Sequence, residues 1–297
     1  MPASKTPIYT ALAANLLIAA AKLTAALLTG SSAMASEGIH SLVDTSNEVL
    51  LLYGMRRSRL PPDEHRPFGY GKELYFWAFV VSLLFFALGG GFSIYEGIHH
   101  LLEPEPVRNP EWNYAILGFA LIFDGISLIT ALREFNRQRG GAPFWQAVKQ
   151  SKDPSTFVVL FEDAADVTGI LLAFTGIALG QYFHNPYADG IASILIGLLL
   201  TFVAIFLVRE SRSLLMGETA SPQEVAQIID LVQNAPGILQ VSHHQSMYLS
   251  PEEVMLQLQV RFRPGLNSED LVATTQQLRL NIQQLFPHFQ HIAIEAV

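Results

Sequence analysis

The chain has 297 residues, of which half are hydrophobic and only 15% are charged, with a formal net charge of −8 and no cysteine. Soluble globular domains carry about a quarter charged residues, so this composition indicates a membrane protein. The negative net charge argues against nucleic acid as a partner, and the lack of cysteine excludes disulfides and thiolate metal sites.

Six apolar stretches are long enough to cross the roughly 30 Å hydrocarbon layer of a bilayer. They cover residues 8–29, 33–55, 74–101, 113–133, 156–182 and 188–208. The first is not followed by a small-residue cleavage pattern, so we expect it to be retained as a membrane helix. Lys5 precedes the first stretch, and basic residues are frequent in the connections after the second, fourth and sixth stretches. The connections after the first, third and fifth stretches hold only one basic residue, Arg108. The positive-inside rule therefore predicts a multi-pass protein with both termini in the cytoplasm, and we expect the membrane to be a bacterial inner membrane.

The composition changes after Arg212, where the hydrophobic runs shorten to the length of strands. We therefore expect a transmembrane domain over residues 1–213 and a second, cytoplasmic domain over 214–297. In the second domain, a helical pattern opens at Ser221 or Pro222 and stops at Pro236. Strands are predicted at 238–249, 254–262 and 292–297, with a helix at 268–286. The order αββαβ predicts a small α+β module, ferredoxin-like, with helices on one face of a sheet.

Two pairs of polar residues within the apolar stretches carry the chemistry. His40 and Asp44 lie four residues apart in the second stretch, and Glu162 and Asp166 lie four apart in the fifth. Residues four apart share one face of a helix. An ionisable side chain within a bilayer costs about 2.5 to 3.5 kcal/mol on insertion scales, which favours a buried site that uses them. One imidazole and three carboxylates could bind a divalent cation if the two helices face each other.

Other polar residues near these pairs have simpler explanations. The two pairs could themselves be hydrogen-bonded contacts between membrane helices. Asn47 could offer an oxygen to the site but is expected to serve helix packing, and Asp163 is expected on a neighbouring face. For Lys22, Glu48 and Asp124 we expect charge compensation or snorkelling to an interface, rather than a proton route. Asp189 is expected to cap the sixth membrane helix, at whose start it lies.

Three separated motifs resemble the cation diffusion facilitator family of metal exporters. They are Gly30–Asp44 at the entry to the second stretch, His65–Glu73 in the loop after it, and Tyr95–Pro104 at the exit of the third. The resemblance covers nearly the whole chain. It implies a homodimer in a lipid bilayer that exports a divalent metal, usually Zn²⁺, from the cytoplasm in exchange for protons.

The resemblance also implies roles for individual residues. His40 and Asp44 match the family's ligands in the second span, and Glu162 and Asp166 match those in the fifth. Glu162 departs from the His or Asp that many members carry there, which leaves the preferred metal open. The family often has a weaker cation site in the loop after the second span, for which Asp63 and His65 are the candidates here.

The family pattern fails most clearly in the cytoplasmic domain. Members with a dimer-bridging zinc cluster carry His on the second strand and a His-x-Glu run on the last strand. Here these stretches read Gln-Leu-Gln at 257–259 and Ala-Ile-Glu at 293–295. Four histidines, His243, His244, His288 and His291, remain in this domain. Of these, His243 and His244 are the metal candidates, but adjacent strand residues point to opposite faces. We therefore expect this domain to dimerise without a bridging metal.

The sequence thus predicts Zn²⁺ efflux by proton-coupled antiport with alternating access, with no cofactor and no enzymatic step. Export of Mn²⁺, Fe²⁺, Co²⁺, Ni²⁺ or Cd²⁺ is the alternative, because nitrogen and oxygen ligands serve all of these ions. An intramembrane metallohydrolase is another alternative, but it would need a general base, and the carboxylates of the predicted site are all used as metal ligands. A membrane-anchored metal sensor would leave the buried pairs unexplained.

Overall fold

A computed structural model describes residues 6–297, so Lys5 lies outside the described residues. The chain divides into two compact units. The first contains Met1–Met55 and Phe76–Ser211, and the second contains Arg56–Tyr75 and Arg212–Val297. The loop after the second membrane helix therefore belongs with the C-terminal part of the chain, a grouping that the sequence does not predict.

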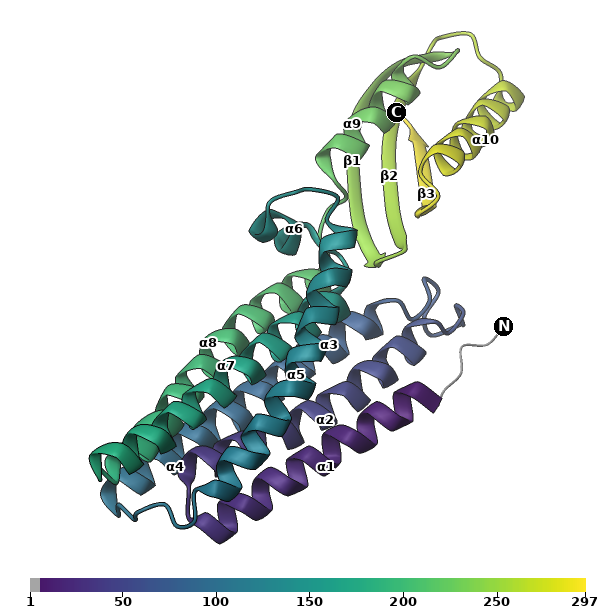
Figure 1. Cartoon of the computed structure of the whole chain (residues 1–297). Coiled ribbons are helices and arrows are strands. Elements are labelled where there is room, and N and C mark those ends of the chain that lie inside the picture. Colours follow the sequence, from purple (N-terminus) through teal and green to yellow (C-terminus); the bar gives the residue numbers. More distant parts are fainter. Residues whose placement is uncertain (1–5) are drawn as a thin grey trace. The chain divides into compact units, whose positions relative to one another are not determined.

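The first unit is a bundle of long helices, and each of the six predicted stretches is helical (Figure 1). Its helices are α1 (Thr6–Thr29), α2 (Ser32–Ser58), α3 (Lys72–Leu84), the π-helical turn η1 (Phe85–Gly90), α4 (Gly91–Leu102), α5 (Glu111–Gln138), α7 (Pro154–Phe183) and α8 (Tyr187–Met216). The elements α3, η1 and α4 follow one another without a break and form the third span, Lys72–Leu102. A short helix, α6 (Phe144–Gln150), precedes α7.

Three of the described helical segments are long and apolar enough on their own to cross a membrane: Lys72–Leu102, α5 and α8. In α1, a shorter apolar helical stretch runs from Asn15 to Thr29. The helices α2 and α7 carry the polar pairs and need neighbours that shield these groups from lipid.

Glycines bring the third and sixth spans close together. A Cβ atom added to Gly97 would lie 2.7 Å from the carbonyl oxygen of Gly190 and from a side-chain carbon of Ile194. A Cβ atom on Gly197 would lie 2.7 Å from the backbone nitrogen of Ile94. Small residues allow membrane helices to approach in this way, so α4 and α8 pack backbone to backbone.

The second unit has the predicted αββαβ order. It contains α9 (Pro222–Gln233), β1 (Ile238–Ser250), β2 (Glu253–Phe262), α10 (Ser268–Leu285) and β3 (Phe289–Ala296). The sheet order is β1-β2-β3, with β1 antiparallel and β3 parallel to β2. Pro222 opens α9 at a position that needs no backbone N–H, and Asn267 caps α10 by accepting a hydrogen bond from the Asp270 N–H.

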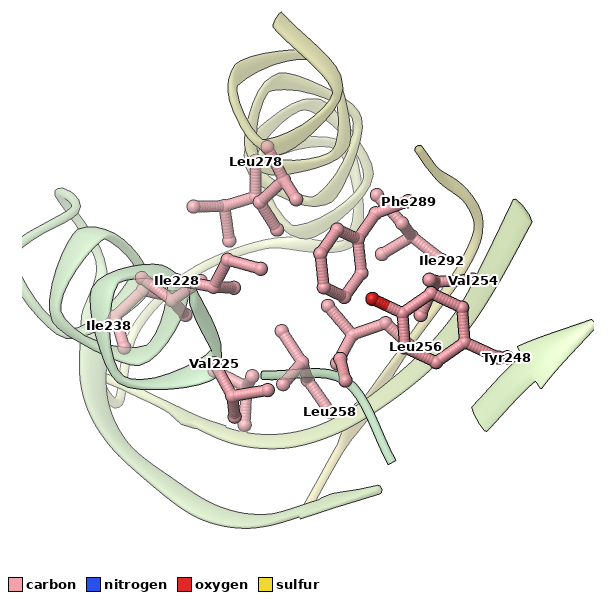
Figure 2. Packing of buried hydrophobic residues seen from close by; sticks show 14 residues of the cluster. Val225, Ile228, Ile238, Tyr248, Val254, Leu256, Leu258, Leu278, Phe289 and Ile292 are labelled. Atoms are coloured by element: carbon pink, nitrogen blue, oxygen red, sulfur yellow. The ribbon is translucent and has the colours of Figure 1, made fainter. Parts of the chain in front are cut away.

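One hydrophobic core holds this unit together (Figure 2). Alternate residues of β2, including Leu256 and Leu258, are fully buried, as strand periodicity requires. Ile228 from α9, Leu278 from α10 and Phe289 from β3 pack against them. The two helices therefore cover the same face of the sheet.

The segment 56–75 is attached to this unit by side-chain contacts. The Phe68 ring packs edge-on against His291, with ring centroids 5.5 Å apart. A Cβ atom on Gly71 would lie 2.7 Å from the carbonyl oxygen of Leu249, so only glycine fits there without a shift.

Candidate metal centre

The helices α2 and α7 bring together three of the four predicted ligands. His40, Asp44 and Asp166 each offer a ligand atom, and these atoms all lie within 4.8 Å of one another. His40 Nδ1 lies 3.3 Å from Asp44 Oδ2, and His40 Nε2 lies 3.1 Å from Asp166 Oδ1. The imidazole ring is fully buried and the two carboxylates are mostly buried. Among the described residues, this is the only such group of three or more ligand residues.

The nitrogen and oxygen atoms that this group could offer to a metal lack ordinary hydrogen-bond partners. Within the part of the chain that the structure describes, neither nitrogen of His40, neither oxygen of Asp44 nor Oδ1 of Asp166 makes a hydrogen bond. Buried polar groups in proteins are almost always hydrogen-bonded, and two buried carboxylates this close repel each other. A metal ion held among these atoms would give each of them a partner and would offset the repulsion between the carboxylates. One nitrogen and several oxygens suit Zn²⁺ and neighbouring divalent transition metals.

The fourth predicted ligand, Glu162, lies outside this group. It is buried, and its Oε1 accepts a hydrogen bond of 2.8 Å from the Asn47 amide. The Oδ1 atom of Asn47 is buried without a partner in the described residues. The structure thus pairs Glu162 with Asn47 across α2 and α7. Asp163 lies toward a different helix, because its Oδ2 accepts a hydrogen bond of 2.8 Å from Ser127 in α5.

The third span closes the other side of the His40 ring. The Phe85 ring packs edge-on against the imidazole at 5.2 Å between centroids. A Cβ atom on Gly89 would lie 4.0 Å from His40 Nδ1. Both residues belong to the π-helical turn η1, and π-helical turns are frequent at functional sites. The apolar pattern of the third span does not indicate this contribution, and the Gly-Gly-Gly run at 89–91 is the one signal for it in the sequence.

A buried cation lies next to the group. The Lys22 ammonium donates hydrogen bonds to Glu37 Oε2 at 3.1 Å and to Ser41 Oγ at 2.8 Å, and it lies 3.8 Å from Asp124 Oδ2. The expected charge compensation is therefore confirmed for Lys22 and Asp124, whereas Glu37 was not singled out in the sequence. Glu48 instead accepts a hydrogen bond from the Asn15 amide at 3.3 Å.

Asp189 lies in the first turn of α8, where a carboxylate was expected, and its hydrogen bonds reach across to the N-terminus of α2. Its Oδ2 accepts hydrogen bonds from the Ser32 N–H at 2.5 Å and the Ala33 N–H at 3.3 Å, and its Oδ1 accepts one from the Ser31 hydroxyl at 2.7 Å. The carboxylate reaches α2 because the start of α8 lies beside it. Asp189 therefore fixes the helix that carries His40.

The loop candidates Asp63 and His65 form part of a folded turn. Asp63 Oδ1 accepts hydrogen bonds from the backbone N–H groups of His65 and Arg66, and Oδ2 accepts one from the Tyr70 hydroxyl at 2.6 Å. The hydrogen bond from Tyr70 and those from the backbone lower the pKa of Asp63. Arg57 and Arg66 both lie over the Tyr70 ring, 5.0 and 4.6 Å from its centroid. Both carboxylate oxygens are thus already engaged.

The strand candidates His243 and His244 are neighbours on β1, with ring centroids 6.4 Å apart. Both are exposed, and they pair with Gln259 and Leu258 of β2. In the described part of the second unit, they do not belong to any group of three closely spaced ligand residues.

Comparisons with known proteins place this arrangement in context. Residues 8–216 match the family model described as the cation efflux transmembrane domain. The chain is 34% identical over 243 residues to the human mitochondrial proton-coupled zinc antiporter SLC30A9. The alignment covers 81% of this chain and 43% of that protein. It is also 26% identical over 222 residues to the manganese efflux system protein MneP of Bacillus subtilis. That alignment covers 72% of this chain and 69% of MneP.

A solved structure also matches the C-terminal part. The nickel form of a variant MamM C-terminal domain covers 26% of this chain and 96% of that chain, at 12% identity and a TM-score of 0.25. The chain spans less than half the length of the human zinc antiporter.

Proposed function

Because the chain belongs to the cation efflux family, whose members are membrane transporters and not enzymes, we propose that it exports Zn²⁺ or a similar divalent cation. The observation that supports this most directly is the meeting of His40, Asp44 and Asp166 inside the helical bundle. Their donor atoms face one another without hydrogen-bond partners among the described residues. Such a group can hold a metal ion, and its place within membrane helices suits an ion in transit.

We further propose that Glu162 supplies the fourth ligand when the ion is bound. Glu162 lies one helical turn before Asp166 on the same face of α7. Its carboxylate is held by a single described side-chain hydrogen bond, from the Asn47 amide. Exchange of that hydrogen bond for coordination would complete a set of one nitrogen and three oxygens. Zn²⁺ commonly takes four ligands of these types.

Proton exchange is the proposed coupling. A histidine nitrogen must lose its proton before it can bind a metal, so binding of metal and of proton exclude each other. In the described arrangement, each nitrogen of the His40 ring faces a carboxylate, so a proton and a metal ion would compete for the same atoms. Protons that enter from the far side of the membrane would then displace the ion. The human relative is named a proton-coupled zinc antiporter, which agrees with this mechanism.

We also propose that the protein acts as a homodimer with both termini in the cytoplasm, most simply in a bacterial inner membrane. The basic loops after the second, fourth and sixth membrane helices support this orientation. Dimerisation through the second unit would not need metal, because His243 and His244 have no third ligand beside them in the described residues. Sedimentation of the full chain in detergent before and after chelation tests this point, and a dimer that is lost on chelation would contradict it.

The decisive experiment measures flux in sealed proteoliposomes under an imposed pH gradient, with Zn²⁺, Mn²⁺, Fe²⁺, Co²⁺, Ni²⁺ and Cd²⁺ compared side by side. Asp44→Ala and Asp166→Ala should abolish flux because each removes one of few ligands. Glu48→Ala and Asp163→Ala are matched controls on the same two helices, since their carboxylates bond to Asn15 and Ser127 instead. Wild-type rates in either Asp44→Ala or Asp166→Ala would contradict the assignment. Metal flux without proton movement would leave a uniporter as the better account.

A further inference from the structure

The buried cation beside the metal centre is the feature that the proposed mechanism does not use. Lys22 is fully buried in α1, and its ammonium contacts the carboxylates of Glu37 in α2 and Asp124 in α5 at 3.1 and 3.8 Å. Glu37 is fully buried as well, and the Asp124 side chain is 17% exposed. We refer to Lys22, Glu37 and Asp124 as the lysine triad.

The lysine triad lies next to both helices that supply the ligands. Glu37 precedes His40 by three residues, so the two lie on adjoining turns of one face of α2. Ser41, which accepts a hydrogen bond from the ammonium, directly follows His40. A Cβ atom on Gly169 would meet the Glu37 carboxylate, and Gly169 lies three residues beyond Asp166 on α7. Glu37 thus lies within about one helical turn of His40 and contacts the turn of α7 that follows Asp166, and the Lys22 ammonium is hydrogen-bonded to it.

Stability alone does not explain such a group. A buried ion pair can often be replaced by apolar residues of similar size without loss of stability, because its desolvation offsets its attraction. A fixed charge inside a protein does, however, act strongly on other charges nearby, since water screens it little. A lysine ammonium repels an approaching divalent cation, and a carboxylate attracts it.

We propose that the lysine triad sets the metal affinity of the centre through its net charge, with Lys22 weakening binding enough for the ion to be released. This inference rests on the proposed transport function. Lys22 acts as a tethered cation that partly offsets the carboxylates around the centre. Glu37 and Asp124 hold it in place and tune its effect. Neither Lys22 nor its partners coordinate the ion.

Opposite charge changes at the same ion pair provide the test. Zn²⁺ binding would be measured by titration calorimetry on the full chain in detergent, with flux measured in proteoliposomes. Lys22→Gln should bind Zn²⁺ about tenfold more tightly and release it more slowly, whereas Glu37→Gln should bind it about tenfold more weakly. The double variant Lys22→Gln/Glu37→Gln should return to within about threefold of wild type, and Lys22→Arg should keep the wild-type affinity.

A merely structural role makes a different prediction. Lys22→Gln and Glu37→Gln break the same contact, so a structural role would shift affinity in the same direction for both. That outcome, or no shift in either variant, would overturn the inference. If Lys22→Gln fails to fold, Asp124→Asn and Glu37→Gln should both weaken binding relative to Lys22→Arg, and unchanged affinity in both would overturn it. A wild-type protein that neither binds nor transports Zn²⁺ would instead refute the proposed function.

Discussion

Removal of the Asp189 carboxylate should destabilise the membrane unit and misplace the helix that carries His40. This side chain accepts hydrogen bonds from two backbone N–H groups at the start of α2 and from the hydroxyls of Ser31 and Ser32. It is 2% exposed, so water cannot replace it. Its role is that of a helix N-cap supplied by another helix.

The contacts allow an estimate of the effect. Loss of an N-cap costs about 0.5 to 2 kcal/mol, and a buried donor left without a partner costs about 1 to 3 kcal/mol. The four bonds end on one carboxylate, so their energies are not additive. We therefore expect Asp189→Ala to lower the free energy of unfolding by about 3 kcal/mol. Asp189→Asn should lower the free energy of unfolding by about half as much, because its amide oxygen can still accept a hydrogen bond from the Ser32 N–H.

The assay is thermal unfolding of the full chain in detergent, combined with flux in proteoliposomes. For a unit of this size, about 3 kcal/mol corresponds to a fall in Tm of roughly 6 to 12 °C. His40 lies eight residues beyond Ser32, about 12 Å along the helix, so fraying of the first turns should also reduce flux. Glu105→Gln is the control, because its ion pair with Arg108 is exposed and weak. An Asp189→Ala variant as stable as Glu105→Gln would refute this reasoning.

Further predictions concern packing, pH and selectivity. Gly97→Ala should cost about 1 to 3 kcal/mol in detergent unfolding because its Cβ meets α8, whereas the control Gly118→Ala, with open space around it, should be neutral or slightly stabilising. Phe289→Ala should cost the second unit about 3 to 5 kcal/mol, as measured by urea unfolding, and a cost below 1 kcal/mol would contradict the packing shown in Figure 2. Burial, followed by the charges of two nearby glutamates, raises the pKa of Tyr248 to about 12, so a wild-type minus Tyr248→Phe absorbance titration should show that midpoint. Because the folded pKa is raised, the associated stability is fully present below pH 10 and is lost as the pH rises toward 12. His40→Asp should lower the ratio of Zn²⁺ to Mn²⁺ flux, since an all-carboxylate site suits the harder ion, and an unchanged ratio in an active variant would show that His40 does not contact the ion.

Features that lie within one helix or strand could be predicted from the sequence. The six long helices and the αββαβ module follow from the length and period of the apolar runs. The pair of His40 and Asp44 on one face of α2 follows from their spacing of four residues. The position of Asp166 beside them required only that the two helices face each other.

Partnerships between helices could not be predicted in the same way. Lys22 lies 15 residues from Glu37 and 102 residues from Asp124, and no local pattern links them. The sequence places Asp189 at the start of α8, where the structure has it, but no local pattern indicates its hydrogen bonds to the start of α2. The π-helical turn was also not predicted, because residues 83–91 are all apolar and show no periodicity that an inserted residue could disturb.

The position of Glu162 shows how the relative direction of two helices decides which of the predicted ligands meet. His40 contacts Asp166, and Asn47, further along α2, contacts Glu162, earlier in α7, so the two helices run antiparallel. Asn47 lies three residues after Asp44 on α2, and Glu162 lies four residues before Asp166 on α7. Because the helices are antiparallel, both residues are displaced by about one turn in the same direction. Glu162 therefore meets Asn47 in the next layer of the bundle, although it shares a face with Asp166. In the proposed site, the Glu162 carboxylate and the unpaired Asn47 oxygen are the next polar neighbours of His40, Asp44 and Asp166 on that side. Coordination by Glu162 would therefore require its side chain to leave the Asn47 amide and to reach back by about one helical turn toward Asp166.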